Sequence, residues 1–321
     1  MNSKNKIVTV NFCHLIIVFT INKSFLLPFA VTLHSLLLHN KGELKKLIVL
    51  TDEIPESDQE KIKEIIGEND IDFELIQISD DDLSGLVTTL HFQKANYYRL
   101  LIPEFVREDK VIYLDADLLI LGSLLPIWET PLTNNYLAAV CTPGVSWHPE
   151  LGVSKEDGYF NSGVMLLNLR KWREENFGRR VIDFVSDNPK LIRYVDQCGL
   201  NALAKNNWIR LPLSHNLTVD VYEGDFEFGD CGCSKEDINR AKKSPLIVHF
   251  TGTSKPWHTS NQHPFKKKFW KFLRQTPYSR SLPEDFSTLN FIKYLTPKFF
   301  RQGIRRFQYR FFPRGKFKLM K

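Results

Sequence analysis

Val111-Ile-Tyr-Leu-Asp-Ala-Asp-Leu-Leu-Ile120 is an apolar run interrupted by two carboxylates, Asp115 and Asp117. A short run rich in leucine and β-branched residues predicts a buried strand. The i, i+2 spacing predicts that both carboxylates project from one face of this extended segment. Burying unpaired carboxylates is costly, so we expect the pair to face a cation at the carboxyl end of the strand.

The same Asp-x-Asp triplet occurs twice more, at Asp70-Ile-Asp72 and Asp80-Asp-Asp82. Both copies stand among polar neighbours, and we interpret them as solvated turn carboxylates. Only the copy at 115–117 is embedded in apolar residues, so the metal site is predicted there.

Strands and helices are expected to alternate on either side of this run. Ser57-Asp-Gln-Glu60 has the sequence of a capping box that opens a helix. The predicted order is a strand over 14–20, a helix over 27–39, a strand over 46–51, a helix from 57 to 66, a strand over 73–78 and a helix over 92–104. This order predicts an α/β fold with a mostly parallel central sheet, covered by helices on both faces. Ligands of such sheets bind beyond the carboxyl ends of the strands.

Length and composition fit one large α/β domain with an extension. The chain has 321 residues, a net charge of +6 and five scattered cysteines, an odd number. Their odd number and scattered positions argue against a disulfide framework and for a reducing compartment. Residues 7–19 resemble the apolar part of a signal peptide, but Asn11 and His14 interrupt them and no small-residue cleavage site follows. They are also too few to span a membrane, and we expect a core strand instead.

Three polar motifs in the second half have both a structural and a functional interpretation. Asn161-Ser-Gly163 leads into an apolar strand, and Asp196-Gln197 precedes an apolar helical stretch. Turn capping and helix capping explain these two equally well. A third strand leads into a loop with Gly252 and Lys255. Backbone amides and an ammonium there suit a diphosphate.

Taken together, the motifs over residues 15–258 resemble glycosyltransferase family 8, which includes bacterial lipopolysaccharide α-galactosyltransferases and, more distantly, glycogenin. The motifs that carry the resemblance are Ile17-Val-Phe-Thr-Ile-Asn-Lys-Ser-Phe25, His91 with Arg99, Tyr113-Leu-Asp-Ala-Asp117, Phe160-Asn-Ser-Gly163, Asp196-Gln197 and His249-Phe-Thr-Gly-Thr-Ser-Lys-Pro-Trp-His258. The resemblance implies one Rossmann-like nucleotide-diphospho-sugar transferase domain of the GT-A type, placed at residues 1–275. It also implies a retaining transfer of galactose or glucose from a UDP-sugar to a saccharide or lipid-linked acceptor, as in lipopolysaccharide or other cell-surface glycan synthesis.

The resemblance further implies a role for each motif residue. Asp115, Asp117 and His249 would hold Mn²⁺, or alternatively Mg²⁺. Asp196 and Gln197 would be the catalytic residues. In one mechanism Gln197 or Asp196 acts as the nucleophile, and in the other the acceptor attacks the donor sugar on the same face from which UDP departs. The nucleotide would contact Thr20, Asn22, Ser24, Ala116, Gly252 and Lys255, and the donor sugar and its phosphates would contact His91, Arg99 and Asn161.

The chain departs from the family pattern at three places. Asn22-Lys23 replaces an acidic pair, Thr142 stands where an aspartate lines the sugar pocket, and Cys198 replaces the second aspartate of Asp-Gln-Asp. A non-catalytic sugar-nucleotide-binding protein is therefore an alternative. A phosphotransferase or nuclease is a third, but it requires more converging acids than this chain offers.

The C-terminal extension, placed at residues 276–321, differs in composition from the rest. From residue 286 onward it has ten cations, no acid and interleaved aromatic residues. This composition is typical of a helical segment lying on an anionic membrane. RNA binding and a solvated tail are the alternatives, but we expect no nucleic acid partner. The resulting prediction is a cytoplasmic protein attached to the inner face of the cell membrane.

Overall fold

The computed structural model describes residues 14–79, 95–142, 148–223 and 232–288. Its helices and strands are β1 (Leu15–Ile21), α1 (Leu26–Asn40), β2 (Leu44–Thr51), α2 (Glu56–Ile66), β3 (Asp72–Gln77), α3 (Ala95–Phe105), β4 (Lys110–Leu114), β5 (Leu118–Ile120), α4 (Leu125–Trp128), β6 (Leu137–Cys141), β7 (Phe160–Asn168), α5 (Leu169–Glu174), α6 (Phe177–Asp187), α7 (Val195–Ala204), β8 (Trp208–Arg210), β9 (Leu217–Thr218), α8 (Asp220–Glu223), α9 (Lys235–Lys243), β10 (Ile247–His249) and α10 (Lys266–Leu273).

Two sheets form the centre of the molecule. The larger has seven strands in the order β3-β2-β1-β4-β7-β6-β8, and the smaller has the order β5-β10-β9. Strands β3, β2, β1 and β4 are parallel, whereas β7 runs antiparallel to both β4 and β6. The predicted α/β class with a mostly parallel sheet is confirmed. The reversal of β7 brings its first residues to the edge where β1 and β4 end.

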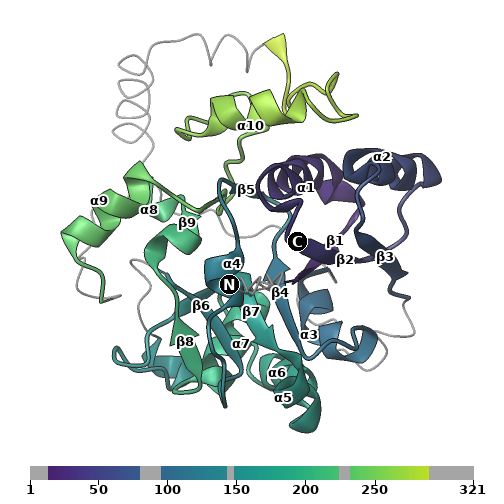
Figure 1. The fold of residues 1–321 in the computed structure, drawn as a ribbon. Helices are drawn as coiled ribbons and strands as arrows, with labels where there is room; N and C mark the ends of the chain where they lie inside the picture. The colour runs from purple at the N-terminus through teal and green to yellow at the C-terminus, as the bar shows by residue number, and fades with distance from the viewer. Residues whose placement is uncertain (1–13, 80–94, 143–147, 224–231, 289–321) are drawn as a thin grey trace, which may run out of the picture.

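Helices cover both faces of the large sheet (Figure 1). Both faces need cover because successive apolar side chains of β1 point to opposite faces. Leu15, Ile17 and Phe19 pack in one core with residues of α1 and α2. Val18, between them, packs in the opposite core with residues of α3, α5, α6 and α7. Helix α10 packs on α1 (Figure 1) and, through Phe269, Phe272 and Leu273, in a third core with residues of β10.

Two local predictions were wrong. The single strand expected over 111–120 is two strands in different sheets, and the residues between them form a bend. The carboxylates lie in that bend, where the chain passes from one sheet to the other. The capping box at 57–60 was also wrong, because α2 begins at Glu56 after Pro55 and so includes Ser57. Pro55 fixes an extended backbone before the first turn and ends the preceding loop without a side-chain cap.

The expected helix over 92–104 is α3, and residues 92–94 lie outside the described part of the chain. Among the described helices, none is long and apolar enough to cross a membrane. The residues just after 275 pack on the main body, because the Tyr278 hydroxyl donates to Asp58 Oδ1 at 2.9 Å.

Candidate active site

The bend between β4 and β5 is held by α1. The Thr32 hydroxyl donates to the carbonyl of Ala116 at 2.6 Å and accepts from the backbone N–H of Leu118 at 3.0 Å. Thr32 is fully buried, as is Ser35, whose hydroxyl accepts from Ile120 N–H at 3.0 Å. These bonds fix the backbone that carries Asp115 and Asp117.

The pairing of β10 with β5 brings a histidine to the two carboxylates. His249 stands opposite Leu118, directly after Asp117. Its Nε2 lies 3.3 Å from Asp117 Oδ1 and 3.6 Å from Asp115 Oδ2. One ligand atom from each of the three residues lies within 4.8 Å of the other two. The predicted metal residues are thus brought together, and two carboxylates with one imidazole fit a borderline divalent ion.

The first residues of β7 complete this side of the site. Asp115 N–H donates to the carbonyl of Gly163 at 2.8 Å, which places the start of β7 directly beside the bend. A Cβ on Gly163 would lie 2.3 Å from Cε1 of His249 and 2.5 Å from Oδ2 of Asp115. Only glycine fits between the two ligand residues, which explains its place after Asn161 and Ser162.

Arg99 of α3 joins the metal side of the site to α7. Its guanidinium lies 3.1 Å from Asp115 Oδ1 and 3.3 Å from Asp196 Oδ2, and it donates to the carbonyl of Ser162 at 3.0 Å. Burial disfavours the charge of Arg99, but Asp115 and Asp196 outweigh burial and raise its pKa. Burial raises the pKa of Asp196, and the attraction of Arg99, which lowers it, does not offset this effect. Asp196 therefore lies in a dry, hydrogen-bonded environment, where Ser162 Oγ donates to it at 3.1 Å.

Gln197 is held by two donors at the start of β7. Its Oε1 accepts from the backbone N–H of Ser162 and from Nδ2 of Asn161, both at 3.1 Å. Val195, two residues earlier, has φ +42°, an uncommon conformation for a β-branched residue. This turn directs both Asp196 and Gln197 toward β7, in the first turn of α7.

The loop after β10 supplies a cation. Lys255 Nζ donates to Asp117 Oδ2 and to the carbonyl of Phe250, both at 2.6 Å. Burial alone would raise the pKa of Asp117, but Lys255 and His249 outweigh it and hold that pKa well below its usual range. Gly252 in the same loop is exposed and has φ +79°, a backbone conformation that favours glycine.

Thr20, one of the residues predicted to bind the nucleotide, is linked to Asp115 through the hydroxyl of Tyr113. The Tyr113 hydroxyl donates to Asp115 Oδ1 at 2.7 Å, and its oxygen lies 3.0 Å from Thr20 Oγ1. Because Tyr113 has one hydroxyl proton, Thr20 donates the second bond. Burial raises the pKa of Tyr113 far above its ordinary value, so the phenol stays neutral.

The other residues predicted for the nucleotide lie at the same edge of the sheet. Asn22 directly follows β1, and its side chain accepts from the N–H of Ser24 at 3.0 Å, capping a short turn. Ser24 is exposed, whereas Ala116 is buried in the bend. His91 lies outside the described residues.

Cys198, which stands where the family pattern has an aspartate, makes hydrogen bonds ahead of α7. Its Sγ accepts from the backbone N–H groups of Arg193 at 3.4 Å and Tyr194 at 3.2 Å, and lies 3.2 Å from Tyr159 Oη. The thiol thus satisfies backbone donors ahead of α7. Thr142, the other departure, is buried, and its hydroxyl finds no hydrogen-bond partner among the described residues.

Three residues that bond the predicted site residues were not themselves predicted: Asn216, Tyr113 and Thr32. Tyr113 stands inside a quoted motif, where its hydroxyl was a usable signal. Thr32 was detectable as a polar residue inside an apolar helix, whereas Asn216 carries no local signal. Its side chain reaches His249 Nδ1 at 3.0 Å and Asn161 Oδ1 at 2.8 Å.

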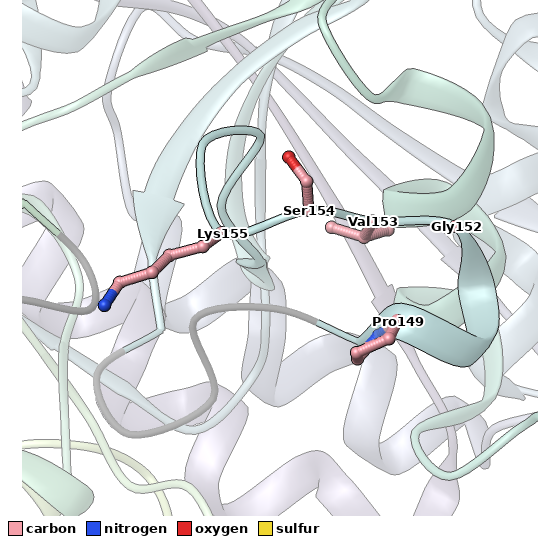
Figure 2. A pocket seen from close by; sticks show the side chains of 5 residues that line it. All are labelled: Pro149, Gly152, Val153, Ser154 and Lys155. Carbon is pink, nitrogen blue, oxygen red and sulfur yellow. The ribbon is translucent and has the colours of Figure 1, made fainter.

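A surface pocket of about 490 Å³ is formed by the segment that connects β6 to β7 (Figure 2). It is lined by Pro149, Gly152, Val153, Ser154 and Lys155. None of the residues predicted for catalysis, metal or nucleotide lines it. The chemistry is therefore assigned to the polar cluster around Asp115, not to this pocket.

Comparison with known proteins identifies the family of the chain. Residues 16–261 match the model of the family described as glycosyl transferase family 8. General stress protein A of Bacillus subtilis (strain 168) is 26% identical over 240 residues, which cover 73% of this chain and 84% of that protein. Lipopolysaccharide 1,3-galactosyltransferase of Salmonella typhimurium is 26% identical over 297 residues, covering 89% of this chain and 86% of that one.

The fold is also similar to a solved structure. The crystal structure of the galactosyltransferase LgtC in complex with donor and acceptor sugar analogues superposes with a TM-score of 0.73 at 24% identity, covering 84% of this chain and 98% of that one. This likeness confirms the GT-A type of fold. The chain therefore belongs to glycosyl transferase family 8, a family of sugar transferases.

Proposed function

We propose that this protein is a metal-dependent, retaining hexosyltransferase that moves galactose or glucose from a UDP-sugar to a saccharide acceptor. The observation that carries the proposal is the convergence of Asp115, Asp117 and His249 beside the cation of Lys255. Relatives named as lipopolysaccharide galactosyl- and glucosyltransferases support an acceptor in lipopolysaccharide or another cell-surface glycan.

In this proposal the nucleotide lies along the edge formed by the ends of β1 and β4. Thr20, Asn22, Ser24 and the backbone of Ala116 would line the nucleoside, and Gly252 N–H and Lys255 would contact the diphosphate. Lys255 Nζ is already within 2.6 Å of a carboxylate that would hold the metal. Lys255 is therefore well placed to neutralise the charge of a diphosphate bound beside the metal.

The donor sugar would then lie between the start of β7 and the first turn of α7. Arg99, Asn161, Asp196 and Gln197 surround that space, with His91 as a further predicted contact. A bound Mn²⁺ or Mg²⁺ would stabilise the charge that develops on the departing diphosphate. Lys255 would hold this anion, while Gln197 presents a fixed carbonyl oxygen to the sugar.

Two mechanisms would retain the configuration at the anomeric carbon: attack by Gln197 or Asp196 as a nucleophile, or attack by the acceptor on the face that UDP leaves. Gln197 Oε1 already accepts two hydrogen bonds, and Asp196 Oδ2 is engaged by Ser162 Oγ and the Arg99 guanidinium. A nucleophilic role for Gln197 would require Oε1 to give up one of these hydrogen bonds, whereas attack by the acceptor on the face that UDP leaves requires no such loss. We favour attack by the acceptor over attack by Gln197 for this reason.

UDP release from a panel of UDP-sugars, with and without Mn²⁺, tests the proposed function. We expect metal-dependent release from UDP-galactose or UDP-glucose and slower release from the other sugars. A protein that binds UDP with Mn²⁺ but hydrolyses no UDP-sugar would be a binding protein. Absence of both binding and release would refute the proposal.

We also propose that the protein attaches peripherally to the inner face of the cell membrane through residues 276–321. Residues 276–288 fold against the main body, and the remainder lies outside the described residues. The described chain that leads into this tail is itself basic. From residue 245 to 283 there is no acid, and α10 exposes Lys267, Lys268 and Lys271. Glu284 and Asp285 follow this stretch, and the ten cations from residue 286 onward come after them. Basic segments of this kind complement anionic lipid headgroups.

Truncation before Phe286 is expected to release the protein from anionic vesicles while leaving UDP-sugar hydrolysis unchanged. Each cation near the headgroups contributes about 1 kcal/mol, so losing ten of them should abolish most binding. Vesicle co-sedimentation measures this, and added salt should weaken attachment of the full chain. A full-length variant with Arg107, Arg170 and Lys190 neutralised serves as the charge control and should still pellet. If the truncated and full chains pellet equally, the tail is not the anchor.

A further inference from the structure

Asn216 is fully buried and lies just before β9. Pairing of β9 with β10 sets Thr218 opposite His249, so the chain at Asn216 passes beside the imidazole. The Asn216 side chain makes two contacts, one with His249 and one with Asn161. It therefore touches a candidate metal ligand and a residue next to the proposed sugar site.

Backbone donors fix the orientation of the two amides. Gly163 N–H donates to Asn161 Oδ1 at 3.0 Å, and a backbone N–H can only donate, so this atom is the carbonyl oxygen. The Asn216 atom 2.8 Å from the same oxygen must then be its NH₂ group. Asn216 consequently turns its carbonyl oxygen toward Nδ1 of His249, 3.0 Å away.

The tautomer of His249 follows from this orientation. An amide oxygen can only accept, so Nδ1 of His249 must carry the proton. In the neutral ring, Nε2 then keeps its lone pair, and this nitrogen is the one that faces Asp115 and Asp117. A neutral imidazole with a free Nε2 lone pair is the form that binds a metal.

The other end of the chain of bonds reaches the residue proposed for catalysis. Ser162 N–H identifies Oε1 of Gln197 as its carbonyl oxygen, and Nδ2 of Asn161 donates to the same atom. The three side-chain bonds therefore run in one direction, from His249 through Asn216 and Asn161 to Gln197. Hydrogen bonds aligned in this way polarise one another.

We propose that Asn216 is a positioning residue that selects the metal-binding tautomer of His249 and links it to Gln197. The proposal rests on the metal role assigned to His249 under the proposed function. Partners that orient a ligating histidine commonly change metal affinity by about 10–100-fold when they are removed. Metal affinity is thus the direct readout of this role.

Mn²⁺ titration of the nucleotide-free protein, with free Mn²⁺ followed by electron paramagnetic resonance, tests the proposal. Asn216→Ala should weaken Mn²⁺ binding by about 10–100-fold. Asn216→Asp keeps an acceptor for Nδ1–H, so it should retain Mn²⁺ affinity at or above that of the natural protein. It cannot donate to Asn161, so its turnover should nevertheless fall.

Asn40→Ala is the matched control. Asn40 is equally buried, and its side chain bonds Leu36, Gly122 and Leu124 at the far end of α1. Both alanine variants should lose thermal stability, but only Asn216→Ala should lose Mn²⁺ affinity. Unchanged affinity in folded Asn216→Ala, or equal losses in the alanine and aspartate variants of Asn216, would overturn the proposal.

A measurement on the natural protein removes any dependence on whether a variant folds. ¹⁵N NMR of labelled histidines, assigned with a His249→Gln variant, should show His249 protonated at Nδ1. Protonation at Nε2 alone would overturn the inference. Normal Mn²⁺ binding without UDP release would instead refute the proposed enzyme activity and leave the role of Asn216 intact.

Discussion

Asn in place of Asp117 is expected to abolish Mn²⁺-dependent binding of UDP while leaving the fold intact. Asp117 is 5% exposed, and its carboxylate is shared between His249 and Lys255 at 3.3 Å and 2.6 Å. Its depressed pKa means that it is ionised wherever the protein is folded near neutral pH. Asparagine keeps the volume but removes the charge that the metal requires. Because loss of a supporting partner costs about 10–100-fold in metal affinity, loss of a ligand should cost more than about 100-fold.

Calorimetric titration of UDP with and without Mn²⁺ measures this effect. Asp58→Asn is a suitable control, because Asp58 also bonds a lysine ammonium, Lys61 at 2.8 Å, but lies on α2. We expect the control to bind UDP with Mn²⁺ as the natural protein does. An Asp117→Asn protein that retains metal-dependent UDP affinity would remove the metal assignment.

The sequence predicted the order of elements well wherever a local pattern determined them. Strand β1 and helix α1 have alternating or continuous apolar residues and begin and end close to their predicted limits. The carboxylates of Asp115 and Asp117 were predicted as a site for a similarly local reason, since charge inside an apolar run is costly.

Other features depend on contacts between distant segments and had no local signal. An apolar run does not reveal that β4 and β5 belong to different sheets, because each of them is buried. The direction of β7 is likewise set by its pairing with β4, more than 40 residues earlier in the chain. This reversal creates the contact between Gly163 and Asp115, so the most confined part of the site was the least predictable from sequence.

Asn216 illustrates the same limit for a single side chain. It stands in a short polar stretch, and nothing around it distinguishes it from a loop asparagine. Its role arises from the parallel pairing of β9 with β10, which adds one strand to the small sheet. Residues that orient ligands are therefore harder to predict than the ligands themselves.

Gln197→Ala is expected to lower kcat far more than it weakens UDP-sugar binding. The side-chain oxygen of Gln197 bonds Asn161 and Ser162 rather than a candidate metal ligand or Lys255, so the nucleotide and metal contacts should survive its loss. Its Oε1 is held by two donors at 3.1 Å, at the place proposed for the reacting sugar. Removing one preorganised group of this kind commonly costs about 10²–10³-fold in kcat. The UDP-sugar dissociation constant should change by less than about threefold, the pattern of an interaction made mainly in the transition state.

Steady-state kinetics together with calorimetry of the UDP-sugar separates these two effects. Gln59→Ala provides a matched control, because Gln59 also lies in the first turn of a helix and bonds one backbone carbonyl, that of Ile54 at 3.2 Å. The control should leave both kcat and affinity unchanged. If Gln197→Ala loses affinity and keeps its kcat, Gln197 is a donor-binding residue. In that case the buried carboxylate of Asp196, with its raised pKa, becomes the group next to the reacting carbon. Asp196→Asn would then be the variant in which kcat falls.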